Sequence, residues 1–163
     1  MHRQTTKIQV THCFEYPCQT VFDCWLQESA TARWLLTALD APEPKVELDA
    51  RVGGRFQISQ QRQQGPLLLT GLFHLIEPPH QLLFSLENPL YAEPDLVRLQ
   101  FTPHPFGCEL TVFHHLPVLA LPAQQKLIER WTNILMRLAA DLNDQRQTPK
   151  RHGLTRLYPA LRL

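Results

Sequence analysis

Apolar and polar residues alternate along several short segments of the chain. In the first of these segments Ile8, Val10 and Phe14 share one phase, and polar residues occupy most of the positions between them. A period of two is typical of a strand with one buried face. The same alternation recurs at residues 46–50, 55–59, 82–86, 97–101 and 110–114, and residues 67–76 are expected to form a longer strand. The pattern therefore predicts about six to seven strands, whose apolar faces must be buried.

Three other segments have helical spacing. Val21, Phe22 and Trp25 form an apolar face just after Pro17, and a second short helix is expected around Trp34. Between residues 127 and 142 the apolar residues recur at i, i+3, i+4 and i+7, which predicts an amphipathic helix of about twenty residues. The polar positions on the opposite side of this helix are Lys126, Glu129, Arg130, Asn133 and Arg137.

The order of these elements predicts an α+β fold. A strand comes first, two short helices follow, and further strands precede the long C-terminal helix. The polar residues 60–66 are expected to connect two strands as a hairpin loop, and residues 77–80 to form a sharp turn. A curved antiparallel sheet would bury its apolar face against the long helix. Because the concave face is wider than one helix, this arrangement predicts a central cavity.

Charge is distributed unevenly along the 163 residues. Residues 145–163 carry five basic residues and no acidic one, so we expect a domain at 1–144 followed by a basic tail at 145–163. The remaining body then has 11 basic and 15 acidic residues. An acidic body argues against a nucleic-acid partner. The apolar content of 44% and charged content of 19% are those of a globular protein.

The cysteine spacing and the known catalytic motifs narrow the function further. Cys13, Cys18 and Cys24 are five and six residues apart, which does not match a tight zinc-ligand pair, and we expect free thiols. The N-terminus lacks the apolar run of a signal peptide and no segment reaches 18 apolar residues. We therefore expect a cytoplasmic protein with no transmembrane segment. No nucleophile or phosphate-loop motif is present, so no metal, cofactor or catalytic residue is assigned.

Six short motifs resemble, in the right order, those of the START-like (SRPBCC) superfamily. Residues 21–25 (VFDCW) with Trp34 resemble its opening, and residues 71–73, 77–79 and 82–84 resemble a strand pair. Residues 49–56 (DARVGGRF) resemble a segment of bacterial proteins related to the C-terminal domain of the heat-shock-protein ATPase activator. Residues 110–114 resemble a later strand, and Trp131 lies in the matching closing helix. The resemblance covers about residues 8–142.

The resemblance implies a helix-grip fold with a central cavity and leaves three functions open. The first is non-catalytic binding of a small hydrophobic or amphipathic ligand. The second is a chaperone-associated protein-interaction domain of the stress response, with a protein partner or a homodimer. The third is a polyketide-cyclase-like enzyme using His114, with His74 as a weaker candidate. A shared fold does not decide between them.

The candidate ligand-binding residues are mostly large aromatic side chains on the elements expected to face the cavity. His114 shares the inward phase of its strand and offers a polar contact. Arg51 is a candidate partner for a ligand carboxylate, although an ion pair with Asp49, Glu47 or Asp23 is the favoured alternative. The full set comprises Trp34, Phe56, Phe73, Phe84, Phe101, His114, Trp131, Leu135 and Arg51.

Overall fold

The alternating segments form the strands of one sheet, and the segments of helical spacing form helices. The structure, a computed structural model, describes residues 5–36, 42–87 and 92–147. In chain order they form β1 (Thr5–Phe14), α1 (Cys18–Asp23), α2 (Glu28–Trp34), β2 (Lys45–Leu48), β3 (Arg55–Arg62), β4 (Gly65–Glu77), β5 (Gln81–Leu86), β6 (Asp95–His104), β7 (Gly107–Pro117) and α3 (Leu121–Gln147). The predicted α+β helix-grip architecture is confirmed.

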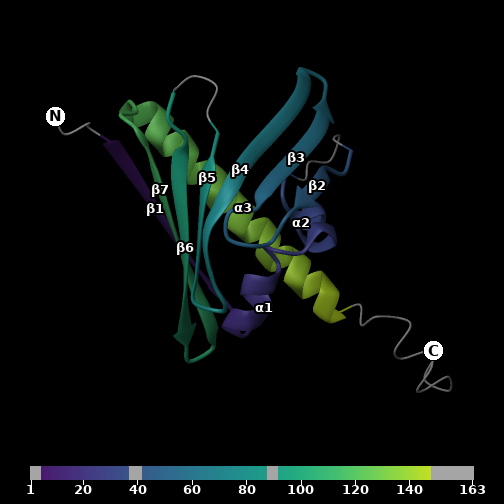
Figure 1. Cartoon of the computed structure of the whole chain (residues 1–163). Helices are drawn as coiled ribbons and strands as arrows, with labels where there is room; N and C mark the ends of the chain where they lie inside the picture. The colour runs from purple at the N-terminus through teal and green to yellow at the C-terminus, as the bar shows by residue number, and fades with distance from the viewer. Residues whose placement is uncertain (1–4, 37–41, 88–91, 148–163) are drawn as a thin grey trace.

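The seven strands form one antiparallel sheet in the order β1-β7-β6-β5-β4-β3-β2. The sheet curves around α3, which crosses behind it from β1 toward α2 (Figure 1). The register places Val97 opposite His114 and Leu99 opposite Val112. Because side chains at paired positions point to the same face, the predicted inward phase of residues 97–101 and 110–114 is confirmed.

One helix cannot cover the concave face of this sheet. Seven strands at a spacing of about 4.8 Å are about 29 Å wide, whereas a helix with its side chains is about 10–12 Å across. Helix α3 packs against β1 and α2, α2 packs against β2, and α1 packs against β6 and β7. Most of the space between α3 and strands β2–β5 is therefore not filled by a helix, and only side chains project into it.

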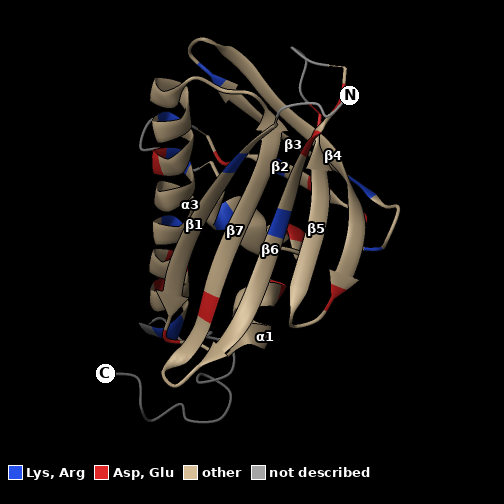
Figure 2. Cartoon of the chain, turned by 90° about the vertical axis from the view of Figure 1, so that its left-hand side faces the viewer, with Lys and Arg blue, Asp and Glu red and all other residues tan. Residues whose placement is uncertain are grey.

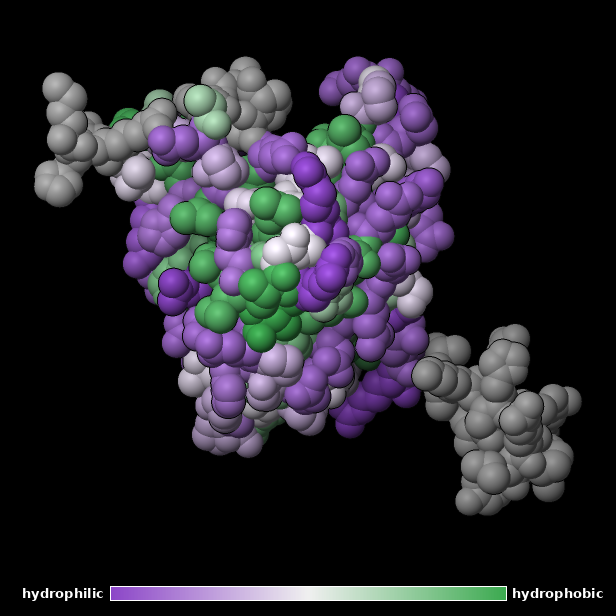
Figure 3. Space-filling model, viewed as in Figure 1, coloured by the Kyte–Doolittle hydropathy of each residue, from purple (hydrophilic) through white to green (hydrophobic). Residues whose placement is uncertain are grey.

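The outer side of the sheet has few charges. Figure 2 views this side, with scattered Lys, Arg, Asp and Glu among uncharged residues. Figure 3 shows apolar side chains gathered over the middle of the sheet. The strand pairing places Leu72, Leu83 and Leu96 on the outer side of β4, β5 and β6. Leu96 is exposed and the other two are half-buried. No helix among those described covers this surface (Figure 1).

Two expectations about element length are wrong. The expected loop at residues 60–66 is mostly strand, because the pairing of β3 with β4 continues to Arg62 opposite Gly65. Backbone hydrogen bonds extend the hairpin beyond the apolar core, so the polar residues after Gln60 mark exposure to solvent and not a loop. Helix α3 has 27 residues, not about twenty, because its apolar stripe marks only the buried turns. The predicted domain boundary falls inside α3, and residues 148–163 of the predicted tail lie outside the described residues.

Two adjacent glycines connect the turn before β3 to strand β4. Gly53 has a φ of +83°, which favours glycine, and its N–H donates to the Phe73 carbonyl at 2.7 Å. Phe73 N–H donates in return to the Gly54 carbonyl at 2.9 Å. A Cβ at Gly54 would collide with the Asp49 carbonyl oxygen. The two glycines thus hold the backbone of Phe73, whose side chain points to the concave side.

Candidate ligand-binding cavity

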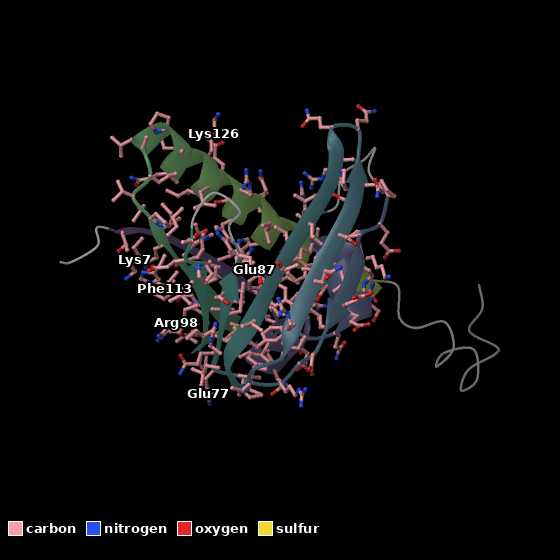
Figure 4. The ribbon with its side chains drawn as sticks, turned by 45° about the horizontal axis from the view of Figure 1, so that its top comes forward. Lys7, Glu77, Glu87, Arg98, Phe113 and Lys126 are labelled. Carbon is pink, nitrogen blue, oxygen red and sulfur yellow. The ribbon has the colours of Figure 1, made fainter. Side chains whose placement is uncertain are left out.

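A cavity of about 440 Å³ lies between α3, α2 and strands β2–β5. Most of its lining residues are aliphatic or aromatic. This volume is within the range of about 300–1,000 Å³ that small-molecule sites occupy. Figure 4 looks toward the space between α3 and the β3–β4 hairpin, into which side chains project from both. The structure therefore contains a mostly apolar cavity where the fold leaves the sheet uncovered by α3.

Three phenylalanines form one wall of the cavity. Phe56, Phe73 and Phe84 come from β3, β4 and β5, and their ring centroids are 5.3 to 6.5 Å apart. Such tilted and edge-on contacts are the favoured geometry of aromatic pairs. Gly71 lies opposite Phe56, and a Cβ there would collide with the Ser85 carbonyl oxygen and the Phe56 ring. The absence of a side chain at Gly71 thus leaves room for the Phe56 ring.

A buried polar network closes the cavity beside α3. Trp131 Nε1 donates to His114 Nδ1 at 3.0 Å, and His114 Nε2 lies 2.9 Å from Asp95 Oδ2. The three residues come from α3, β7 and β6 and are between 4% and 8% exposed. A buried polar group is costly unless it has a hydrogen-bond partner. The network therefore fixes α3 to the sheet through side chains that satisfy one another.

The donors in this network determine the tautomer of His114. An indole N–H can only donate, so the Nδ1 atom of His114 accepts and carries no proton. In the neutral ring the proton is then on Nε2, which donates to the Asp95 carboxylate. Both ring nitrogens are engaged within the protein. His114 lines the cavity but offers it no free nitrogen lone pair.

The mouth of the cavity is basic. Arg130, Asn133 and Arg137 line it from α3, and Arg62 lines it from the end of β3. All four are exposed, and no acidic residue lines the cavity within the described ranges. Arg33, Arg51 and Arg55 elsewhere each pair with a carboxylate, whereas no ion pair of the described residues involves the three arginines of the mouth. Three guanidinium groups with no carboxylate partner in the described part of the chain thus surround the entrance to an apolar space.

Arg62 is oriented by a buried side chain. Its Nε donates to Gln60 Oε1 at 2.7 Å, and Gln60 is only 4% exposed. The amide nitrogen of Gln60 donates to the carbonyls of Leu36 and Pro42 at 2.8 and 3.0 Å. Gln60 therefore connects the chain after α2 to β3 and holds the Arg62 guanidinium by one edge. The terminal nitrogens of Arg62 remain available to other acceptors.

The structure brings five of the nine candidate residues to the cavity lining, namely Phe56, Phe73, Phe84, His114 and Trp131. The other four lie elsewhere. Trp34 and Leu135 are buried in the core, and the Phe101 ring packs against Phe22 at 5.1 Å. Arg51 is exposed and pairs with Asp49 at 2.9 Å, which is the favoured alternative of the sequence analysis.

The three arginines of the mouth were missed by sequence reasoning. The helical pattern places Arg130, Asn133 and Arg137 on the polar side of α3, and the structure shows that this stripe borders the cavity. The spacing of these three α3 residues at i, i+3 and i+7 was the available signal, because it places them on one helix face beside Trp131 and Ile134. The same spacing is equally typical of a solvent-exposed face, so it does not identify a site alone.

The thiols are free and three of them are buried. Cys18, Cys24 and Cys108 are buried and Cys13 is exposed. Burial, with a smaller effect of the Asp141 carboxylate, raises the pKa of Cys24 to about 11. Burial and the Cys18 thiol, whose Sγ lies 2.8 Å away, raise the pKa of Cys108 far above its usual range. Within the described residues no three His, Cys, Asp or Glu side chains could hold a metal ion, and no helix there is long and apolar enough to cross a membrane.

The curved sheet, the long closing helix and the cavity between them define a START-like helix-grip protein. Residues 15–143 match the model of the family described as Activator of Hsp90 ATPase homolog 1-like protein. The chain belongs to this family. No curated protein matches the sequence.

Solved bacterial structures share the fold. A protein of unknown function from Staphylococcus aureus is 12% identical, with a TM-score of 0.79 over 90% of this chain and 98% of the other. An AHSA1-like protein from Aeromonas hydrophila is 24% identical, with a TM-score of 0.73 over 89% and 97% of the two chains. An uncharacterised protein from Rhizobium leguminosarum is 15% identical, with a TM-score of 0.73 over 88% and 97%. At these identities the likeness establishes the fold alone.

Proposed function

We propose that this protein binds a small hydrophobic or amphipathic molecule in its central cavity without transforming it. The observation that carries the proposal is the cavity of about 440 Å³ with its mostly apolar lining. An apolar ligand that leaves water for such a space gains about 25 cal/mol for each Å² of buried apolar surface. The aromatic wall of Phe56, Phe73 and Phe84 supplies much of that contact surface.

The geometry around His114 favours binding over catalysis. A general base must have a free lone pair within hydrogen-bond reach of the proton it removes. His114 Nδ1 accepts from Trp131, and Nε2 donates to Asp95. His74, the weaker candidate, does not line the cavity, and its Nε2 lies 3.0 Å from Ser85 Oγ. Neither imidazole is therefore placed to act on a bound ligand.

Filling the cavity tests this function. Leu69 lines the cavity from β4, and its neighbour Leu68 is 58% exposed outside it. Leu69→Trp should occupy the space of the ligand, whereas Leu68→Trp adds the same indole to the outside and serves as the matched control. Native mass spectrometry of the purified proteins would compare the mass retained by each. We expect retained ligand in the parent protein and in Leu68→Trp, and its loss in Leu69→Trp.

The same mass measurement can also contradict the proposed binding in the cavity. Equal ligand occupancy in Leu69→Trp and the parent protein would place the ligand outside the cavity. A bare mass in all three proteins calls for a second measurement, in which an apolar fluorescent probe is titrated against each. Failure of the probe to bind the parent protein would then remove the proposal.

The family match supports a second function, that of a chaperone-associated interaction domain. The matched family is described by its likeness to an activator of the Hsp90 ATPase. Stimulation of the ATPase of an Hsp90-type chaperone by the purified protein would support this function. The Leu69→Trp protein separates the two functions, because an interaction made by the outer surface should survive when the cavity is filled. Absence of stimulation at micromolar concentration would exclude it.

A further inference from the structure

The geometry points to a ligand with one anionic head group on a single apolar body. We infer that Arg130 and Arg137 of α3 and Arg62 of β3 hold the head at the cavity mouth, while the body lies against Phe56, Phe73 and Phe84. This inference rests on the proposed function and names the ligand class of the same cavity. A carboxylate head on an alkyl chain is the simplest such molecule.

The charge of the mouth is the first argument. Three arginines line the cavity, and no Asp or Glu does so within the described residues. Acidic residues outnumber basic ones, 15 to 11, before residue 145, so the basic mouth does not reflect the composition of the body. An apolar ligand alone would require no such excess. Guanidinium groups bind carboxylates through two parallel hydrogen bonds, which makes an anionic head the matching partner.

The placement of these residues is the second argument. Arg130 and Arg137 are seven residues apart, or about 10.5 Å along the helix axis, on one side of α3. Arginine side chains are long enough to approach a common point from both positions. Asn133 lies on the same stripe between them and adds an amide to this side of the mouth. Two cations and a neutral donor thus border the entrance in one row.

The orientation of Arg62 by its hydrogen bond to Gln60 is the third argument. Buried Gln60 accepts from Arg62 Nε and is itself fixed by the carbonyls of Leu36 and Pro42. This hydrogen bond uses only the Nε–H group of Arg62 and leaves the terminal Nη1 and Nη2 groups available. An arginine that only solubilised the rim would not require a buried partner. Gln60 is therefore a positioning residue for Arg62.

The size of the cavity limits the apolar body. A water-sized group takes about 30 Å³ of liquid volume, so about 440 Å³ holds a chain of about fifteen heavy atoms. A lipid with two long acyl chains does not fit this space. The inference therefore commits to a free single-chain amphiphile, and decanoate is a suitable probe.

The competing explanation is that the arginine stems merely cover apolar surface at the rim. Decanoate and decanol separate the two explanations, because they share a chain and differ in charge. Calorimetric titration should show that the parent protein binds decanoate roughly tenfold more tightly than decanol. The difference should shrink as salt is added, because the mouth is exposed to solvent.

Variants at the mouth complete the test. Arg130→Gln combined with Arg137→Gln should weaken decanoate binding roughly tenfold and leave decanol binding unchanged. Lys126→Gln is the matched control, since Lys126 is an exposed cation of α3 that does not line the cavity (Figure 4). Thermal denaturation would verify that the variants fold as the parent protein does.

The outcomes distinguish this inference from the function on which it rests. Equal binding of decanoate and decanol, unchanged in the double variant, would overturn the anionic head and leave the apolar cavity as the binding site. Binding of neither probe would remove the inference together with the proposed function. A loss of decanoate binding in Lys126→Gln equal to that of the double variant would also overturn the inference, because it would show a general charge effect.

Discussion

The two halves of the sheet use the same strand pattern in different ways. In one half, β1, β6 and β7 pack against α1 and part of α3, and Val97, Leu99, Leu110 and Val112 are 0–1% exposed. In the other half, the inward side chains of β2–β5 surround the cavity, and Leu69 is half-buried. The first is called here the packed half and the second the open half.

The difference follows from where the helices lie. Helix α3 packs against β1 at one edge of the sheet, and α2 bridges α3 and β2 at the other. The two contacts leave a space in front of the intervening strands. Inward-facing residues are therefore not equivalent, because those of the packed half fill the core and those of the open half line a cavity.

The largest expected effect comes from truncating one leucine in each half. Leu110→Ala should lower the free energy of unfolding by about 4 kcal/mol, because it leaves a void in a closely packed core. Leu69→Ala should cost less than about 1 kcal/mol, because one side of Leu69 already faces open space. Urea denaturation of both variants would measure the contrast. Equal losses would show that the open half is packed as tightly as the other.

The network that joins α3 to the packed half should show the next largest effect. His114→Ala removes the partner of Trp131 Nε1 and one partner of Asp95 inside the core. We expect a loss of about 3 kcal/mol in the free energy of unfolding, since buried polar groups lose their compensation. The neighbouring His115→Ala, at an exposed position, should cost less than about 0.5 kcal/mol. Similar losses in the two variants would contradict a structural role for the network.

Thiol reactivity tests how closed the packed half is. At about pH 8, iodoacetamide should modify exposed Cys13 and leave the three buried cysteines largely unmodified, because thiolates are the reactive species. The pKa of Cys24, raised to about 11, keeps its thiol protonated at that pH. Mass spectrometry of the intact native protein would count the modified sites. Rapid modification of Cys18 or Cys108 would show that the packed half opens readily.

The smallest expected effect is on the outer side of the packed half. Partial burial first, and then Lys7 and Arg98, lower the pKa of His115. Lys7 lies over the Phe113 ring, with Arg98 on the next strand (Figure 4). Because the folded state favours neutral His115, the unfolded chain takes up protons more readily as pH falls below about 6.5, and stability falls with it.

His115→Gln removes this dependence and should lose less stability between about pH 7 and pH 5 than the parent protein. Urea denaturation at both pH values would measure the difference. Some pH dependence should remain, because burial also lowers the pKa of His12. A larger acid-induced loss in His115→Gln than in the parent protein would reverse the sign and refute this account.

Periodicity predicted the packed half better than the open half. Residues 97–101 alternate strictly, and the structure places their apolar members inside the sheet together with Leu110 and Val112. In the open half, the polar residues at the end of β3 belong to the strand. Gln60 shows why the pattern failed there, since it is a buried polar residue whose partners lie 18 and 24 positions earlier in the chain.

The candidate cavity residues were likewise predicted better in one respect than in another: the strand face of each was predictable, and its neighbour was not. The aromatic side chains of β3, β4 and β5 were predicted to face the cavity and do line it, because alternation within a strand determines their face. Phe101 has the same inward phase, yet its neighbour is Phe22 of α1. Which helix lies in front of an inward residue depends on contacts between distant segments, and no local pattern contains that information.

By itself the sequence determined the order of the strands and their approximate number, the two short helices, the long amphipathic helix and the inward phase of the aromatic residues. Local periodicity suffices for these features, because each follows from burying one face of a strand or helix. Only the tertiary structure decided that Arg62, Arg130 and Arg137 surround one entrance and that Trp131, His114 and Asp95 form one network. These groups come from elements far apart in the chain, and their proximity depends on how α3 lies across the curved sheet.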